Sequence, residues 1–351
     1  MSNHTKEKMK FTVDFRINYF KVFLYCVLAT CIIITSCRQE EKKSEEDVKG
    51  KNEFSDLNSA IAAQPDNASL LFKRAQLFLE RKNLNQAYDD ISRAVKLDSL
   101  NDDYYLLLAD ICFQGLKIQK SIDAFKKAIS LKPGRIDGHQ KLSELYLYLK
   151  AYPQCLAEAN EALKIDKNLA KAYFIKGFAY KESGDTAKAL SSFQTAVETR
   201  SDYYDAYIQL GILYGARNSP LALQYYSNAL SIQPRSTEAL YNRGLFLQEH
   251  GELEKAVDDY NTLLRIDTRY ADAYYNLGYI DLVYRKDYET AIKHFSNAIR
   301  MNDQYAEAFY NRGLCYEFLG KKEEAMEDYR KALRIIPTFK LAKNKLKGIK
   351  K

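Results

Sequence analysis

The sequence predicts an all-α protein built from helical hairpins that stack one on another along the chain. Two observations support this fold class. A motif returns about every 34 residues between Ala68 and Phe339, and small residues recur at two fixed positions of each copy. A period of this length is typical of repeated helix–turn–helix units. The small side chains are needed where two helices approach closely, because a larger group would push their axes apart.

Eight copies follow head to tail when Ala68 is taken as position 1 of the first. Their boundaries are residues 68–101, 102–135, 136–169, 170–203, 204–236, 237–270, 271–305 and 306–339. The fifth copy is one residue short, at residues 217–220, and the seventh is one residue long, near residues 283–286. We expect the loop inside each hairpin to absorb these changes, because loops tolerate insertions and deletions.

Three positions of the repeat carry the packing pattern. Position 8 is small in every copy: Ala75, Ala109, Ser143, Gly177, Gly211, Gly244, Gly278 and Gly313. Position 27 is Ala in seven of the eight copies, and Leu263 is the exception. Position 24 is large in seven copies and is expected to fill the space between hairpins: Ile91, Phe125, Phe193, Tyr226, Tyr260, Phe295 and Tyr329. The third copy is the weakest, with Cys155 at position 20 and Ala159 at position 24.

This pattern resembles the tetratricopeptide repeat (TPR), a helix–turn–helix unit of 34 residues. The resemblance covers roughly four fifths of the chain, and its clearest copy runs from Ala306 to Phe339. The resemblance implies a right-handed α-solenoid, that is, a superhelix of about eight TPR repeats. It also implies a surface that holds other proteins, and no enzymatic activity.

Short segments are expected to close both ends of the array. Residues 54–67 fit the second half of a repeat, with Ala60 at position 27, and are predicted to form an N-terminal cap helix. Residues 340–351 carry Leu341, Leu346 and Ile349 among six Lys residues. One apolar and one charged face suit a C-terminal cap helix that covers the last hairpin.

Residues 1–36 have the pattern of a secretory signal: a basic start, then a short apolar run. The run ends in Ile34, Thr35, Ser36 and Cys37, which resembles the lipobox of bacterial lipoproteins. The resemblance implies cleavage before Cys37 and acylation of that residue. An uncleaved signal anchor is the alternative. Residues 37–53 are almost wholly polar after the Cys and are expected to form a charged, flexible tether.

Composition argues against several other functions. The net charge of +7 falls to +4 without residues 1–36. A net charge this small does not indicate a protein that binds nucleic acid. No catalytic motif, cofactor fingerprint or metal-ligand spacing occurs, so we expect no enzyme, no cofactor, no metal and no small-molecule substrate. The acidic pairs 89–90, 102–103 and 258–259 are interpreted as helix-surface or helix-start residues. Cys112, Cys155 and Cys315 are expected to be buried free thiols.

The resemblance also places a candidate binding groove on the first helix of each repeat. In the TPR family, positions 2, 5, 6, 9, 12 and 13 of that helix face a ligand on the concave side. In copies six to eight, positions 5, 6 and 9 are Tyr241, Asn242 and Leu245, then Tyr275, Asn276 and Tyr279, then Tyr310, Asn311 and Leu314. A row of Asn side chains, one per repeat, could form hydrogen bonds to the backbone of an extended peptide whatever its side chains are; we call this row the Asn ladder. The neighbouring Tyr rings would add amphipathic contact area. The alternative is that these Asn residues are simply solvated.

The predicted function is a membrane-anchored scaffold or adaptor of the bacterial cell envelope that binds a peptide or helix of a partner protein. Its expected partners are proteins and, through the lipid anchor, a membrane; the expected location is the outer membrane, facing either the periplasm or the cell surface. Two alternatives remain open. One is a regulatory subunit that positions a peptidoglycan- or glycan-processing enzyme, and the other is a periplasmic chaperone for exported chains.

Overall fold

The computed structural model describes residues 54–349, and all regular secondary structure in this range is helical, which confirms the all-α fold class. The chain divides into two compact units, Met1–Ser183 and Gly184–Lys351, which we call unit 1 and unit 2. Cys37, the signal segment and the charged tether lie outside the described residues, so these remain predictions. Within residues 54–349, no helix combines the length and the apolar character that crossing a bilayer requires.

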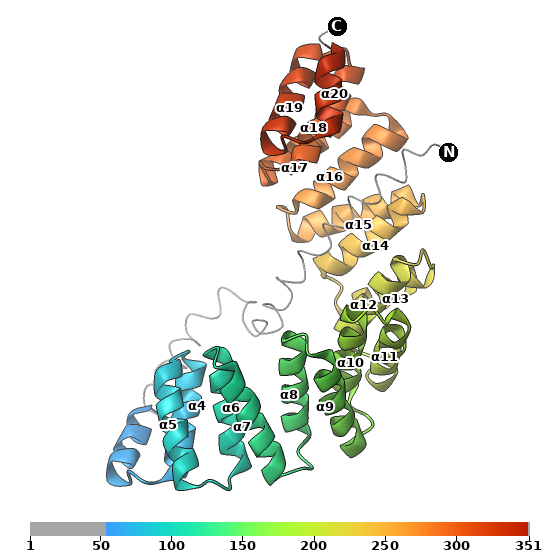
Figure 1. Ribbon diagram of the computed structural model, residues 1–351. Coiled ribbons are helices and arrows are strands. Elements are labelled where there is room, and N and C mark those ends of the chain that lie inside the picture. Colours follow the sequence, from blue (N-terminus) through green and yellow to red (C-terminus); the bar gives the residue numbers. More distant parts are fainter. Residues whose placement is uncertain (1–53, 350–351) are drawn as a thin grey trace. The chain divides into compact units, whose positions relative to one another are not determined.

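Unit 1 is a run of helical hairpins in which consecutive helices pack against each other (Figure 1). A helical segment over residues 54–63 comes first and buries Leu57 and Ile61. The helices that follow are α4 (Ala68–Glu80), α5 (Leu84–Leu97), α6 (Asp102–Gln114), α7 (Ile118–Leu131), α8 (Ile136–Tyr148), α9 (Tyr152–Ile165) and α10 (Ala170–Glu182).

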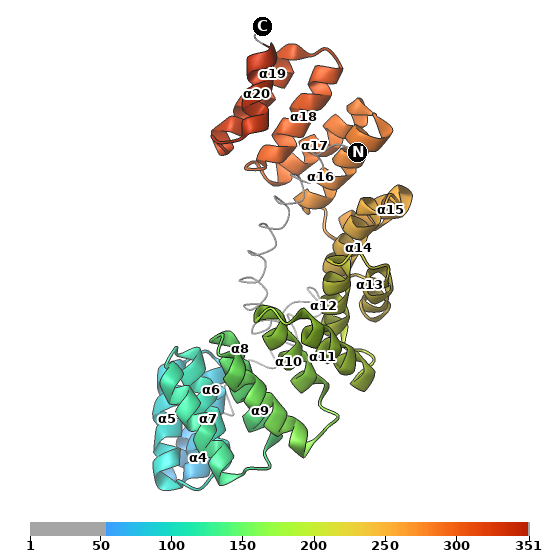
Figure 2. The same cartoon turned by 45° about the vertical axis from the view of Figure 1, so that its right-hand side comes forward.

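Unit 2 continues the pattern, and Figure 2 shows its hairpins from a second direction. Its helices are α11 (Thr186–Thr199), α12 (Tyr204–Gly215), α13 (Leu221–Ile232), α14 (Thr237–Glu249), α15 (Leu253–Ile266), α16 (Ala271–Ile280), η1 (Asp281–Arg285), α17 (Tyr288–Met301), α18 (Ala306–Phe318), α19 (Lys322–Ile335) and α20 (Lys340–Ile349). The even-numbered helices from α4 to α18 begin at the residues from which the eight copies were counted.

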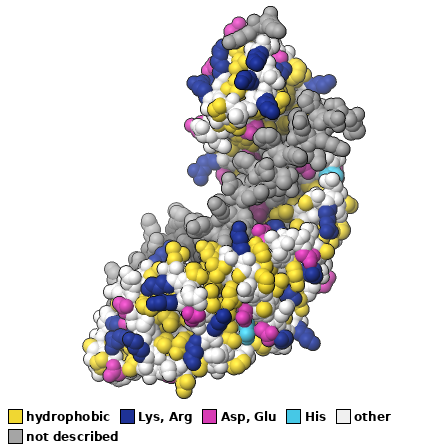
Figure 3. Space-filling view, in the orientation of Figure 1, with side chains coloured by type: hydrophobic (Ala, Val, Ile, Leu, Met, Phe, Trp, Pro, Cys, Tyr) yellow, Lys and Arg dark blue, Asp and Glu magenta, His cyan; other side chains and the backbone are white. Residues whose placement is uncertain are grey.

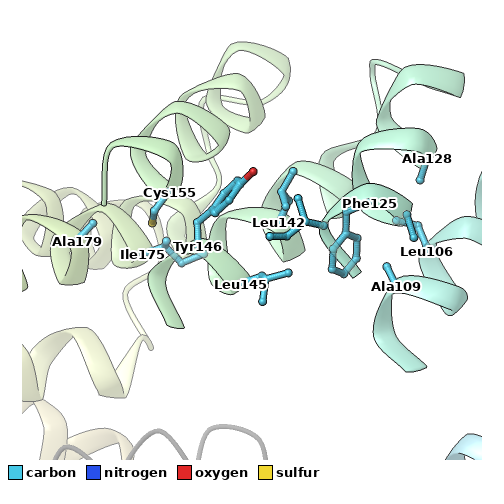
Figure 4. Close-up of a cluster of buried hydrophobic side chains, with 12 residues drawn as sticks. Leu106, Ala109, Phe125, Ala128, Leu142, Leu145, Tyr146, Cys155, Ile175 and Ala179 are labelled. Carbon is cyan, nitrogen blue, oxygen red and sulfur yellow. The ribbon is translucent and has the colours of Figure 1, made fainter. Parts of the chain in front are cut away.

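The core of each hairpin is built from the small and large positions of the repeat. In unit 2, a Cβ atom added to Gly211 would lie 2.5 Å from Tyr226, and one added to Gly313 would lie 2.8 Å from Tyr329. No larger side chain fits there without movement of the ring. In unit 1, Figure 4 shows Leu142, Leu145 and Tyr146 of α8 pointing into a cluster of buried side chains contributed by neighbouring helices.

Every hairpin turns through a residue in the left-handed backbone region. The residue at position 15, or at the corresponding place in the longer seventh repeat, has a φ between +52° and +88°. These residues are Lys82, Leu116, Lys150, Gly184, Asn218, Gly251, Lys286 and Gly320. Only three of them are Gly, although Gly adopts this conformation at the lowest cost.

The extra residue of the seventh repeat is not absorbed by a loop, contrary to the sequence-based expectation. It lies in η1, a π-helical turn that continues directly from α16. An inserted residue widens the helical turn so that its hydrogen bonds span five residues instead of four. The missing residue of the fifth repeat does fall at the hairpin turn, between the end of α12 at Gly215 and the start of α13 at Leu221.

Two acidic residues interpreted as surface residues are buried instead. Asp90 and Asp259 each accept two hydrogen bonds from an Arg residue located 16 positions earlier, Arg74 and Arg243. Both carboxylates are only 5% exposed, and the ion pair compensates for the loss of water around them. Each Arg lies on the other helix of the hairpin, so the residues next to the Asp along its own helix do not indicate the pair.

The C-terminal helix α20 packs on the last hairpin through two of the three residues expected, Leu346 and Ile349. Ala342 is fully buried and Leu346 and Ile349 pack against the same cluster, whereas Leu341 is 42% exposed. The buried stripe of the helix therefore passes through Ala342 in place of Leu341. The three cysteines of the described range, Cys112, Cys155 and Cys315, are buried and free, as expected.

Candidate partner-binding face of unit 2

The candidate residues lie on one face of each first helix in unit 2. On α16, Asp272, Tyr275, Asn276 and Tyr279 are spaced by three, four and seven residues, which places them side by side on the helix surface. The same spacing recurs on α14 and α18. We call this surface the Tyr–Asn face, made of Tyr241, Asn242, Leu245, Tyr275, Asn276, Tyr279, Tyr310, Asn311 and Leu314.

The three Tyr residues at position 5 are held by other aromatic rings. The ring of Tyr275 stacks on Tyr305 with centroids 4.9 Å apart and lies 5.7 Å from Phe295. Equivalent pairs join Tyr241 to Tyr270 and Tyr260, and Tyr310 to Phe339 and Tyr329. Each Tyr is half-buried. The rings are therefore fixed by packing within their own repeat, and only part of each remains available to a partner.

The Asn amides differ from one repeat to the next. Asn242 donates its Nδ2 hydrogen to the backbone oxygen of Glu238 at 2.9 Å. Asn311 donates to the hydroxyl of Tyr275, also at 2.9 Å, and so links two consecutive repeats. Two of the three amides thus donate within the chain. Each of these two amides keeps its second N–H and its oxygen as the groups that a peptide backbone could use.

Asn276 is the exception among the three. Its side chain is only 6% exposed, and its Nδ2 has no acceptor in hydrogen-bonding geometry. Burial raises the pKa of the nearby Tyr260 well above its usual range, and the Asn276 amide opposes part of that rise. A buried polar group without a well-placed partner is costly, so this amide is the least well satisfied of the three.

The position-9 residues are Leu245, Tyr279 and Leu314, and all three are half-buried. Burial raises the pKa of the Tyr279 hydroxyl. Tyr279 packs near Tyr275 on its own helix and near Tyr284 on η1, with ring centroids 6.5 and 6.4 Å away. These side chains supply apolar area between the polar groups of the face.

A column of acidic residues also lies on the Tyr–Asn face. Position 2, one turn before the amide at position 6, is acidic in all four first helices of unit 2: Asp205, Glu238, Asp272 and Glu307. All four are half-buried. The signal was visible in the sequence as a column of acids at one repeat position, next to the column of Asn.

No group of three or more His, Cys, Asp or Glu residues within residues 54–349 could hold a metal ion. The three described histidines contact ordinary protein groups: His139 lies 2.7 Å from Glu158, His250 stacks on Phe246, and His294 lies 2.8 Å from Asp281. The arrangement suits recognition of a partner.

Comparisons with known proteins agree with the repeat pattern. Tetratricopeptide repeat family models match residues 102–135, 170–203 and 306–339, and a TPR repeat model matches residues 247–280 and 281–320. Human tetratricopeptide repeat protein 13 is 25% identical over 164 residues, which cover 45% of this chain and 19% of that protein. Mouse DnaJ homolog subfamily C member 7 is 24% identical over 291 residues, covering 75% of this chain and 58% of that protein. The chain thus spans less than two thirds of either relative.

A solved structure shows the same fold. The C-terminal part of a TPR repeat-containing protein from Cytophaga hutchinsonii is 18% identical, with a TM-score of 0.59, and the match covers 68% of this chain and 98% of that one. Its likeness to the stacked hairpins described above agrees with the family matches along the chain. The chain is a tetratricopeptide repeat protein.

Proposed function

We propose that the protein is an adaptor of the bacterial cell envelope that holds a peptide or helix of a partner protein on the Tyr–Asn face of unit 2. One observation carries the proposal: three consecutive first helices present the same order of Tyr, Asn and an apolar residue on one face. Repetition at a fixed spacing suits an elongated ligand that crosses the helices one after another. Rings already fixed by packing lose little freedom on binding, which favours affinity.

The adaptor role is favoured over a general chaperone for a geometric reason. A ladder that binds any peptide backbone needs equivalent amides in every repeat, whereas Asn242 and Asn311 each use one N–H on a different partner within the chain and Asn276 is buried. What the face offers instead is a fixed set of rings, apolar groups and carboxylates. Such a surface discriminates between partners by their side chains.

The envelope role rests on the sequence of the first 53 residues. Acylation of Cys37 would anchor the protein, because two or more acyl chains give stable membrane attachment whereas one chain binds only marginally. The original protein is expected to incorporate an alkyne-bearing fatty acid in cells, and replacement of Cys37 by Ser is expected to abolish this labelling. An original protein that is found in the membrane fraction without any labelling would instead identify an uncleaved anchor.

Photo-crosslinking in cells tests the partner-binding face. A photoreactive amino acid is placed at Tyr279, Leu245 or Leu314, which are half-buried, because Asn276 is too deeply buried to tolerate a bulky probe. The control site is Lys293 on the second helix α17, which is exposed. One or two proteins captured only from the Tyr–Asn face support the adaptor, and a broad mixture of unfolded chains supports the chaperone. Equal capture from Lys293 contradicts the proposed face.

A further inference from the structure

The four carboxylates at position 2 lie on the Tyr–Asn face itself. Glu238, Asp272 and Glu307 each precede the Asn of their own helix by four residues, and Asp205 precedes Gln209 by the same distance. Residues four apart on a helix are neighbours on its surface. Each first helix of unit 2 therefore presents a carboxylate next to a side-chain amide, on the face already assigned to the partner.

Three of these carboxylates lack the basic partners that such groups usually have. Asp205, Asp272 and Glu307 form no ion pair among the described residues. Arg200 lowers the pKa of Asp205 through charge attraction, but its ion pair is with Asp202. Asp272 has the hydroxyl of Tyr305 as its side-chain partner. Burial raises the pKa of both Asp205 and Asp272, which means that their charged forms are poorly compensated within the protein.

In unit 1, by contrast, the acidic residues on the equivalent face of the first helices are paired with basic residues. Positions 2, 5, 6 and 9 of its first helices also hold four acids, but three Lys residues accompany them. All four acids form ion pairs there: Asp103 and Asp137 with Arg135, Asp110 with Lys141, and Glu144 with Lys171. Figure 3 shows basic and acidic side chains interspersed on the visible face of unit 1. In unit 2 these positions hold four acids and no base at all.

A second, independent observation marks the same surface. Asn276 lies one turn after Asp272 on α16, is only 6% exposed, and has an amide nitrogen without a hydrogen-bond partner. The poorly compensated carboxylate and the buried amide are therefore neighbours on α16. The carboxylate would gain from a ligand that brings cationic groups.

We propose that the segment bound by the Tyr–Asn face is an extended peptide rich in Lys or Arg. This inference rests on the proposed function and names the chemistry of its partner. The cationic side chains pair with Asp205, Glu238, Asp272 and Glu307 along successive helices. Their stems and heads lie over the half-buried Tyr rings, which attract cations through their faces.

Binding of three matched peptides tests this inference. Each is fluorescein-labelled and extended, has about 12 residues and spans about 40 Å, and alternates Ala with Lys, Gln or Glu. Anisotropy is measured with the purified full chain in detergent micelles. The Lys peptide is expected to bind best, the Glu peptide worst, and the affinity for the Lys peptide is expected to fall as salt rises. The triple variant Glu238→Gln, Asp272→Asn and Glu307→Gln should weaken Lys-peptide binding about tenfold or more.

A charge-matched control separates a site from general attraction. The variant Asp258→Asn, Glu289→Gln and Glu323→Gln removes the same charge from exposed positions on second helices of unit 2. It should change the affinity by less than about twofold, because exposed charges at a distance are screened. Equal weakening by both triple variants overturns the proposal. Equal binding of the Lys and Gln peptides also overturns it, but leaves the face as a binding surface.

The crosslinking experiment distinguishes failure of this inference from failure of the proposed function. If none of the peptides binds while Tyr279 still captures a defined protein in cells, the adaptor stands and its partner is not a cationic peptide. If neither assay detects binding, both the cationic partner and the proposed face are rejected. Binding of the Lys peptide that is lost only in the first triple variant supports both.

Discussion

Arg312 holds both carboxylate oxygens of Asp328, with Nε 2.7 Å from Oδ2 and Nη2 2.8 Å from Oδ1. Its remaining nitrogen, Nη1, donates to Ser296 on the second helix of the preceding repeat at 2.9 Å. One guanidinium therefore ties together the two helices of its own repeat and a helix of the previous one. The same arrangement joins Arg243 to Asp259 and Ser227, and Arg74 to Asp90 and Asn58.

The first prediction concerns this bridge. Asp328→Ala leaves the largely buried guanidinium of Arg312 without its carboxylate and should lower the free energy of unfolding by about 3–5 kcal/mol. Urea unfolding followed by circular dichroism measures the loss. Replacing both partners, with Arg312→Met and Asp328→Leu, should cost clearly less than the sum of the two single changes. Additive losses would show that the bridge is not a coupled unit.

The bridge also shows what the sequence could and could not reveal. The periodic positions 8, 24 and 27 predicted the hairpin core, because packing between adjacent helices depends on residues at fixed spacing. The Arg and Asp lie on different helices, 16 residues apart, and were missed when each helix was considered alone. A signal was present: Arg occurs at position 7 in three repeats, and each of those repeats has Asp at position 23.

The candidate face was predictable to a similar extent. Its residues follow from helical periodicity and from the family resemblance. The hydrogen bonds of Asn242 and Asn311 were not predictable, because they depend on the rotamer of each amide and, for Asn311, on the Tyr275 hydroxyl of the preceding repeat. The π-helical turn at 281–285 was not predictable either, because the repeat length shows that one residue is added but not whether a loop or a helix contains it.

A second prediction concerns the turn at Leu116. This residue has a φ of +57° and is 75% exposed, so Leu116→Gly removes backbone strain and loses little packing. The unfolding free energy should rise by about 1 kcal/mol. Leu100→Gly is the matched control, because Leu100 is 76% exposed but is not among the residues with positive φ. That change should be neutral or destabilising; equal stabilisation by both would refute the strain argument.

A third prediction concerns the contact between Gly244 and Tyr260. A Cβ atom at position 244 would lie 2.9 Å from Cε1 of the ring, so Gly244→Ala should destabilise the protein by about 1–3 kcal/mol. The first repeat carries Ala75 and Ile91 at the same two positions, both fully buried. Adding Tyr260→Ile should therefore cost less in the Gly244→Ala variant than in the original protein. Differential scanning calorimetry of the four proteins gives the coupling, and independent effects would contradict the packing account.

The last prediction links the carboxylates of the Tyr–Asn face to stability. Burial raises the pKa of Asp272 above its ordinary value, although the Tyr305 hydroxyl opposes the rise. Because the folded state then holds the proton more tightly than the unfolded state, ionisation of Asp272 costs stability as pH rises through the raised pKa. Asp272→Asn removes this cost while keeping an oxygen that can accept from Tyr305. Its melting temperature should exceed that of the original protein at pH 7, and the difference should vanish below the ordinary Asp pKa of about 3.9.

Asp258→Asn serves as the control for this measurement, since Asp258 is exposed on α15 and its replacement should leave the melting temperature unchanged at either pH. A lower melting temperature of the Asp272→Asn protein at pH 7 would show that the carboxylate is already well compensated by the chain. A higher one means that the folded protein keeps an uncompensated carboxylate at a net cost in stability. Since the same variant is expected to bind the Lys peptide less tightly, gain of stability and loss of binding in one substitution would connect that cost to the partner.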